Sequence, residues 1–180
     1  MSSEKVAYVI GDGGFAREVA AWAAHAGWDI LGLVDRETQA ALVAYAEGTG
    51  RTFNCFLGLG KPSAKMAAVE SLGQYARYPN LLHPASSGDR NEVGHGCIVC
   101  PGTVLTTDVT LGNFVTINLS CTVGHDAVLE DYCSLMPQVA VSGHCRVGRA
   151  AYLGVHAAVL EGLEVGAEAV LGGGALLTKN

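Results

Sequence analysis

Residues 117–147 read INLSCTVGHDAVLEDYCSLMPQVAVSGHCRV, and an aliphatic residue stands at every sixth position of this stretch. The same spacing continues in both directions without a slip. A period of six fits neither an amphipathic helix nor a two-sided sheet, and short repeats of this kind are typical of a parallel β-helix. The series is Val93, Val99, Leu105, Leu111, Ile117, Val123, Leu129, Leu135, Val141, Val147, Leu153, Val159, Val165, Leu171 and Leu177.

A second inward position follows four residues after each aliphatic, and most of its occupants are small. Three hexads make one triangular coil, so residues eighteen apart should stack at about 4.7–4.9 Å, the spacing of paired strands. Glycine or asparagine often follows the aliphatic, and there we expect a tight corner with positive φ. These corner residues are Gly94, Gly112, Asn118, Gly124, Gly148, Gly154, Gly166 and Gly172.

The composition narrows the class of function. The chain has 180 residues and a net charge of −6, with a pI near 5.4 and no run of Lys or Arg. This balance argues against nucleic acid or an anionic membrane surface as a partner. The first ten residues lack a signal-peptide pattern, and no apolar stretch reaches membrane-spanning length. We therefore expect a cytoplasmic protein without membrane insertion.

Six cysteines are present, and four of them occupy the small inward slot of the hexad: Cys97, Cys121, Cys133 and Cys145. We interpret them as reduced residues of the core and not as parts of a disulfide framework. No cysteine pair has metal-type spacing with histidine support, so the sequence predicts no metal site.

The first part of the chain has a different pattern. An apolar run at residues 6–10 leads into Gly11-Asp-Gly-Gly-Phe-Ala16, a helical pattern follows, and a second apolar run stops at Asp35. A strand, glycine turn, helix, strand and acid in this order fit a nucleotide-binding βαβ unit. Backbone N–H groups at the helix N-terminus favour a pyrophosphate, and the acid can accept hydrogen bonds from a ribose or base.

Further elements complete a small α/β domain over residues 1–84. We expect a helix over 37–46, a strand over 53–57, a helix over 62–76 and a strand over 78–82. Residues 85–180 then form the all-β coil domain. About 85 residues hold roughly half of a dinucleotide-binding fold, so one nucleotide diphosphate fits better than a dinucleotide. The glycine motif alone also suits a dehydrogenase.

The segment Val123-Gly-His125-Asp126 places a histidine and an acid on the outer surface near a corner. Because one coil is eighteen residues long, Gly143 should lie one coil above His125, and His144 one coil above Asp126. Acyl transfer to an amine needs a base, a group that orients the base and a donor for the oxyanion. An imidazole, a carboxylate and a backbone N–H on one strip can fill these roles. A solvated histidine beside an acid is the plain alternative.

The two parts in this order resemble the bacterial hexapeptide-repeat nucleotide-amino-sugar N-acetyltransferases, including UDP-4-amino-sugar and perosamine enzymes, and the related sialic acid O-acetyltransferase-like proteins. The resemblance implies a left-handed β-helix of about five coils after a half-Rossmann domain, since periodicity does not determine handedness. It also implies a homotrimer and acetyl-CoA as co-substrate. The implied reaction is acetylation of the 4-amino group of a nucleotide-linked amino-deoxy sugar, with a UDP sugar favoured.

The resemblance also implies roles for individual residues. The catalytic set is His125, Asp126 and Gly143. The residues implied in nucleotide-sugar binding are Gly11, Gly13, Gly14, Phe15, Asp35, Arg36, Gly58 and Lys61. Those implied in acetyl-CoA binding are Ser134, Gly143, His144, Val155, Gly173 and Lys179. Relatives commonly have a histidine where this chain has Ser134, whose hydroxyl cannot carry a charge.

Other functions stay open from the sequence. One is O-acetylation of a sugar or a sialic acid, and another is a non-catalytic nucleotide-binding protein whose coils serve only for assembly. An NAD-dependent dehydrogenase is the third. Apolar residues on the outer faces would be covered in a homotrimer whose active sites lie between subunits. They are Phe114, Leu119, Met136, Tyr152 and Leu160.

Overall fold

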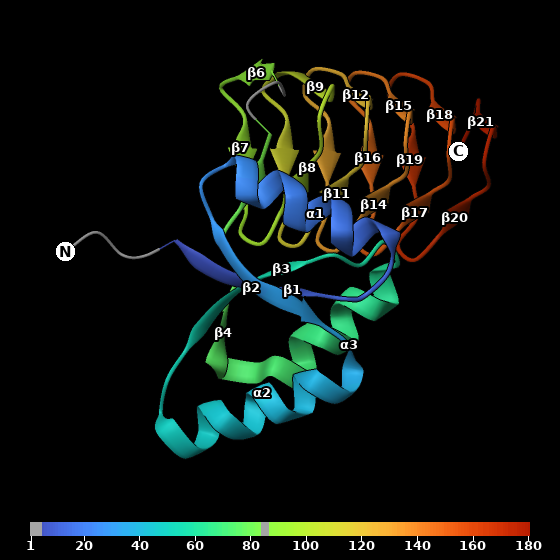
Figure 1. Cartoon of the computed structure of the whole chain (residues 1–180). Coiled ribbons are helices and arrows are strands. Elements are labelled where there is room, and N and C mark those ends of the chain that lie inside the picture. The colour runs from blue at the N-terminus through green and yellow to red at the C-terminus, as the bar shows by residue number, and fades with distance from the viewer. Residues whose placement is uncertain (1–4, 84–86) are drawn as a thin grey trace. The chain divides into compact units, whose positions relative to one another are not determined.

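The computed structural model describes residues 5–83 and 87–180 of the chain. The chain forms two compact units, residues 1–81 and 82–180 (Figure 1). The boundary predicted after residue 84 falls at positions outside the described residues. No helix among the described residues is long and apolar enough to cross a membrane.

The first unit is a parallel four-stranded sheet with the strand order β2-β1-β3-β4. Its elements are β1 (Val6–Ile10), α1 (Gly14–His25), β2 (Asp29–Val34), α2 (Arg36–Thr49), β3 (Phe53–Leu57), α3 (Pro62–Leu72), the short 3-10 helix η1 (Gly73–Tyr75) and β4 (Ala76–Arg77). Strand β1 lies between β2 and β3, so the chain order reverses there. Open α/β sheets bind ligands beside such a point, at the carboxyl ends of the strands.

Two glycines let the elements of this unit approach closely. A Cβ on Gly58 would lie 2.6 Å from the Cα of Ala16, so only glycine lets α1 pack against the end of β3. Gly11 has φ +115°, and its Cβ would lie 2.9 Å from the carbonyl oxygen of Gly58. The turn after β1 therefore depends on glycine for both its backbone conformation and its packing.

The end of this unit differs from the sequence prediction. The helix predicted over 62–76 ends at Leu72, because Gly73 takes φ +54° and stops it. The strand predicted over 78–82 is wrong: β4 ends at Arg77, and Leu81–Leu82 form a separate strand, β5. Pro79 lies between them and has no N–H to donate to a strand ladder.

The second unit is a left-handed parallel β-helix of about five coils, as the repeat and the resemblance predict. Its three walls are parallel sheets in which, from β7 onward, each strand pairs with the strand eighteen residues later, for example Leu111 with Leu129. The first wall contains β5 (Leu81–Leu82), β8 (Ile98–Val99), β11 (Thr116–Ile117), β14 (Ser134–Leu135), β17 (Tyr152–Leu153) and β20 (Val170–Leu171). The second contains β6 (Ser87–Asp89), β9 (Val104–Thr107), β12 (Thr122–Val123), β15 (Ala140–Val141), β18 (Ala158–Val159) and β21 (Leu176–Leu177). The third contains β7 (Glu92–Val93), β10 (Thr110–Leu111), β13 (Val128–Leu129), β16 (Arg146–Val147) and β19 (Glu164–Val165).

The aliphatic series and the small inward slot fill this prism. Polar side chains in the small slot donate hydrogen bonds to the carbonyl fifteen residues ahead. Thr103 Oγ1 donates to Asn118 O at 2.9 Å, and Cys121 Sγ donates to Met136 O at 3.1 Å. All six cysteines are buried and outside disulfides, and burial raises the pKa of the Cys121 thiol to about 11. These thiols are core residues and not accessible nucleophiles.

The corners of the coils correct the predicted role of their glycines. Positive φ occurs three residues after the aliphatic, at glycines such as Gly102 but more often at non-glycine positions such as Asp126 and His144, with φ of 58° and 56°. Several glycines directly after the aliphatic are needed instead for close stacking, although Gly166 and Gly172 meet open space. A Cβ on Gly124 would lie 2.5 Å from Gly143 N, and one on Gly148 would lie 2.5 Å from Ala167 N. One outward aromatic is also covered, because Phe114 is buried.

Candidate active site and nucleotide cavity

The corner between β12 and β13 carries His125 and Asp126, and the corner above it carries Gly143 and His144. Backbone hydrogen bonds hold successive corners in register. The N–H of Asp126 donates to Thr107 O at 3.2 Å, and that of His144 donates to His125 O at 2.8 Å. The histidine and the acid therefore stand on a rigid edge of the prism, where positions eighteen apart are direct neighbours.

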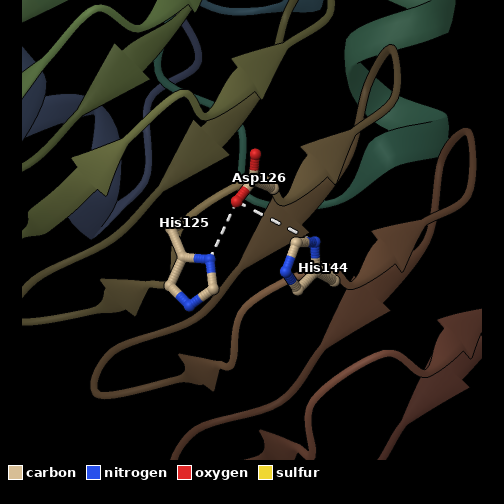
Figure 2. A group of neighbouring side chains, drawn as sticks. All are labelled: His125, Asp126 and His144. Atoms are coloured by element: carbon tan, nitrogen blue, oxygen red, sulfur yellow. Dashed lines mark hydrogen bonds and ion pairs between the residues drawn. The ribbon is translucent and has the colours of Figure 1, made fainter.

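Asp126 holds the imidazole of His125 in a defined orientation. His125 Nδ1 lies 2.8 Å from Asp126 Oδ2 (Figure 2). Because a carboxylate only accepts hydrogen bonds, this contact favours the tautomer of the neutral imidazole in which Nδ1 carries the proton and Nε2 keeps its lone pair. The side chains of His125 and Asp126 are 50% and 48% exposed. The free nitrogen of His125 can therefore serve as a base for a molecule that approaches from solvent.

Gly143 lies directly against this imidazole. A Cβ at Gly143 would be 2.7 Å from both Cε1 and Nε2 of His125, so the ring occupies the space that any side chain there would need. The N–H of Gly143 donates to no acceptor within the described part of the chain. A backbone donor thus lies close to the basic nitrogen, as stabilisation of an oxyanion requires.

His144 is the second imidazole at this corner. Its Nδ1 lies 3.8 Å from Asp126 Oδ2, and its ring meets that of His125 edge to face with centroids 4.9 Å apart (Figure 2). Ligand atoms of His125, Asp126 and His144 all lie within 4.8 Å of one another, a spacing that could hold a metal ion. The sequence prediction of no metal did not consider this set, because its members come from successive coils.

The structure places other predicted acetyl-CoA residues elsewhere in the coil unit. Val155 and Gly173 stack on a different edge, where a Cβ on Gly173 would lie 3.3 Å from Val155 O. Ser134 lies in β14, fully buried, and its hydroxyl has no hydrogen-bond partner among the described residues. Lys179 is exposed beyond β21. Within one chain, only Gly143 and His144 of this set share the corner with His125.

The first unit contains a cavity of about 370 Å³ beside the carboxyl ends of β1 and β2. Of the residues predicted to bind a nucleotide sugar, Gly11, Asp35 and Arg36 line it. Gly13 precedes α1 with φ −76°, and no atom lies within 4 Å of an added Cβ there. Neither packing nor conformation requires glycine at this position, which leaves open space beside the uncapped start of α1.

Asp35 and Phe15 have partners within the unit, and Lys61 lies at the surface. Asp35 caps α2: its Oδ1 accepts from the N–H of Thr38 at 2.7 Å, and this hydrogen bond lowers the pKa of Asp35. Phe15 packs edge to face with Trp22, with ring centroids 6.2 Å apart. Lys61 is exposed where α3 begins.

Sequence reasoning missed Gln39, which also lines the cavity. The helix expected from the sequence began only at residue 37, whereas α2 begins at Arg36 and places Gln39 three residues later on the same helix face.

Comparisons with known proteins agree with this architecture. No protein-family model matches the chain. The crystal structure of PerB from Caulobacter crescentus in complex with CoA and GDP-perosamine has a similar fold, with a TM-score of 0.88, 25% sequence identity and coverage of 97% of this chain and 89% of that chain. This likeness extends over both units of the chain.

Two curated relatives match part of the chain. An acyl-[acyl-carrier-protein]--UDP-N-acetylglucosamine O-acyltransferase of Pseudomonas entomophila (strain L48) is 32% identical over 94 residues, which cover 52% of this chain and 36% of that protein. A GDP-perosamine N-acetyltransferase of Escherichia coli O157:H7 is 31% identical over 84 residues, covering 46% and 38%. The matches thus span little more than a third of each relative's length. Together with the structural likeness, they confirm the resemblance to hexapeptide-repeat acyltransferases of nucleotide sugars.

Proposed function

We propose that this protein is an acetyl-CoA-dependent N-acetyltransferase that acts in the cytoplasm on the 4-amino group of an amino-deoxy sugar linked to a nucleotide. The observation that carries the proposal is the corner of His125, Asp126 and Gly143. There an oriented base lies against a backbone N–H donor on an exposed edge of the prism. PerB, which shares the fold, was crystallised with CoA and GDP-perosamine, and a relative at 31% identity is a GDP-perosamine N-acetyltransferase.

The corner can perform direct transfer without an acyl-enzyme. The sugar amine attacks the thioester carbonyl, a C–N bond forms, and the C–S bond to CoA then breaks. His125 Nε2 accepts the proton that the amine loses and can return it to the leaving thiolate. Asp126 stabilises the imidazolium through Nδ1, and the Gly143 N–H stabilises the oxyanion of the tetrahedral intermediate.

The cavity of the first unit supports a nucleotide-linked substrate. The open space at Gly13 suits the diphosphate, because the start of α1 offers backbone N–H groups and the positive end of its dipole; at Gly14 an added Cβ would meet only the Arg17 side chain, at 3.8 Å. Asp35 keeps acceptor capacity beyond its bond to Thr38 and can accept from a ribose hydroxyl. Binding through the nucleotide would hold the sugar amine for transfer.

We further propose a homotrimer with active sites between subunits. In one chain Gly173 and His125 occupy different edges of the prism, so an acetyl-CoA bound between two prisms could contact His125 of one chain and Gly173 of the next. The wall of β9, β12, β15, β18 and β21 has a face suited to such contact. Its outward residues are small or apolar: Val104, Thr122, Ala140, Ala158 and Leu176.

An acetylation assay tests the proposed activity. The full-length protein is incubated with acetyl-CoA and a panel of UDP- and GDP-linked 4-amino sugars, with the matching 4-hydroxy sugars as controls. We expect one N-acetyl sugar and one free CoA per turnover with at least one amino sugar, identified by mass spectrometry. No transfer to any amino sugar, or tight NAD binding without acetyl-CoA binding, would contradict the proposal.

O-acylation is the second candidate, because the relative from Pseudomonas entomophila is an O-acyltransferase. An ester product would be cleaved by alkaline hydroxylamine, whereas an amide would survive. Transfer to the hydroxy sugars alone would therefore favour this reading.

A further inference from the structure

Gln39 is a nearly buried polar side chain on the wall of the nucleotide cavity. It lies in the first turns of α2, is 8% exposed and lines the cavity with Asp35 and Arg36. Its carboxamide makes no hydrogen bond to any described residue, although buried polar groups almost always have a partner. Neither amide atom of Gln39 is sealed from solvent, since neither is among the fully buried side-chain atoms that lack a hydrogen-bond partner in the described part of the chain.

The wall supplied by α3 suits a flat, apolar ring. Ala64, Ala67 and Ala68 all line the cavity, and their spacing of three and four residues places them on one helix face. Small side chains at all three positions leave a smooth surface against which a nucleobase can lie. The cavity therefore combines an apolar patch on α3 with the unpaired carboxamide of Gln39, and the hydroxyl-bearing Ser71 lies one turn further along α3. Apolar surface with a few polar groups is typical of small-molecule sites.

The positions of Asp35 and Gln39 along α2 suggest which part of a nucleotide would lie beside each of them. Asp35 stands at the helix N-cap, nearest to the glycine turn, and Gln39 follows one turn further along the helix. A nucleotide whose diphosphate lies at the start of α1 would place its ribose beside Asp35 and its base beside Gln39. We propose that Gln39 is a specificity-determining residue that pairs with the adjacent C=O and N–H of a lactam nucleobase such as uracil or guanine. This inference rests on the proposed nucleotide-sugar function.

The chemistry of the two bases provides a sharp test. A carboxamide offers one donor and one acceptor, so it can pair with O4 and N3–H of uracil or with O6 and N1–H of guanine. A carboxylate only accepts. It would match the N1–H and N2–H2 donors of guanine, but it would face the carbonyl oxygens that flank the single N3–H of uracil. The variant Gln39→Glu should therefore disfavour uracil relative to guanine.

The experiment measures the affinity of the full-length protein for UDP, GDP and inorganic pyrophosphate by calorimetry, for the wild type and for Gln39→Glu. Gln74→Glu adds the same charge at an exposed position of the same unit outside the cavity, and it serves as the matched control. We expect Gln39→Glu to weaken UDP binding by about 10- to 100-fold, as expected when a buried hydrogen bond is replaced by an unfavourable contact. Binding of GDP should weaken less or improve, and pyrophosphate should show only the small change seen in Gln74→Glu.

The outcomes separate the inference from the function on which it rests. A shift of the UDP-to-GDP affinity ratio toward GDP supports it, as does a loss for UDP that pyrophosphate does not share. Equal losses for UDP, GDP and pyrophosphate would show a charge effect and overturn it. Unchanged binding of both nucleotides would overturn it while leaving a nucleotide site in place. If the wild type binds neither UDP nor GDP, the proposed nucleotide site fails together with this inference.

Discussion

Gly143 is the residue on which the geometry at His125 depends most directly, since the imidazole fills the space of the missing side chain. In Gly143→Ala the new Cβ would lie 2.7 Å from the ring, so the imidazole must turn away from its position. A displacement of about 1 Å in a catalytic group can cost roughly 10²-fold in rate. We expect a loss of kcat near that size with little change in the thermal unfolding temperature.

Gly166→Ala is the matched control for this variant, because no atom lies within 4 Å of a Cβ at Gly166. Both proteins are assayed by release of free CoA. A rate for Gly143→Ala within twofold of the control would show that the position of the His125 ring is unimportant.

The sequence predicts the cluster at this corner but not all of its detail. Eighteen-residue arithmetic places Gly143 beside His125 and His144 beside Asp126, and the structure has both neighbours. The arithmetic cannot show that a Cβ would collide with the ring, since that depends on a side-chain rotamer. Gln39 was missed for a related reason. It stands out as a candidate binding residue because it is nearly buried without a hydrogen-bond partner among the described residues, and the sequence alone does not show this.

At the scale of elements, the spacing of the coils depends on some of the glycines that follow an aliphatic, such as Gly124 and Gly148. A Cβ on Gly148 would lie 2.5 Å from Ala167 N, a backbone atom that cannot rotate away. Gly148→Ala must therefore push two coils apart, and overpacking of this kind costs about 1–3 kcal/mol.

Thermal unfolding followed by circular dichroism measures this effect against Gly166→Ala. We expect a clear drop in the unfolding temperature for Gly148→Ala and almost none for the control, whose Cβ meets open space. Equal stability of the two variants would contradict the stacking role of Gly148.

The start of α2 predicts a dependence on pH. The backbone N–H of Thr38 donates to Asp35, and this hydrogen bond lowers the carboxyl pKa below its usual 3.8. The resulting stability is present above the unfolded value of 3.8 and is lost as the pH falls through the lower folded value. Asp35→Asn keeps a neutral cap but lacks this contribution.

The stability advantage of the wild type over Asp35→Asn should therefore be full near pH 6 and shrink below about pH 3.8. Unfolding temperatures across this range measure it, and Asp29→Asn is the control at an exposed strand position. An advantage that grows as the pH falls would have the wrong sign for this account.

The secondary structure predicted from the sequence is correct where a local repeat determines each strand. It is wrong where the chain passes from one unit to the other. The aliphatic period predicts every coil strand from β7 to β21, because each inward position faces the same prism. From the sequence, the glycines after the aliphatics were attributed to a positive φ, whereas the crowded ones are required by close stacking between coils. Contacts between coils leave no pattern within a single hexad. The strand predicted over 78–82 failed because Pro79 and the change from sheet to coil interrupt an apolar run.

At the scale of the whole molecule, the proposed shared active site predicts complementation between damaged chains. A His125→Ala chain retains Gly173, and a Gly173→Trp chain retains His125. Each variant alone should be nearly inactive, whereas a trimer assembled from an equal mixture should regain about a quarter of its sites, because one interface in four pairs two intact surfaces.

Refolding the mixture and measuring the acetyl-transfer rate tests this prediction, with light scattering to establish the oligomeric state. Activity no higher than the sum of the two inactive parents would argue against a site formed between subunits. A fully active monomer would exclude it.

The most direct test of the whole account compares acetyl transfer from acetyl-CoA to a nucleotide-linked 4-amino sugar by the wild type, by His125→Ala and by His25→Ala. His25 lies exposed on α1 and controls for the loss of a histidine far along the chain from the corner. If His125 is the general base, His125→Ala should lower kcat by about 10²–10⁴-fold, and His25→Ala should match the wild type. A His125→Ala protein that acetylates the sugar at the wild-type rate would contradict the proposed chemistry at this corner.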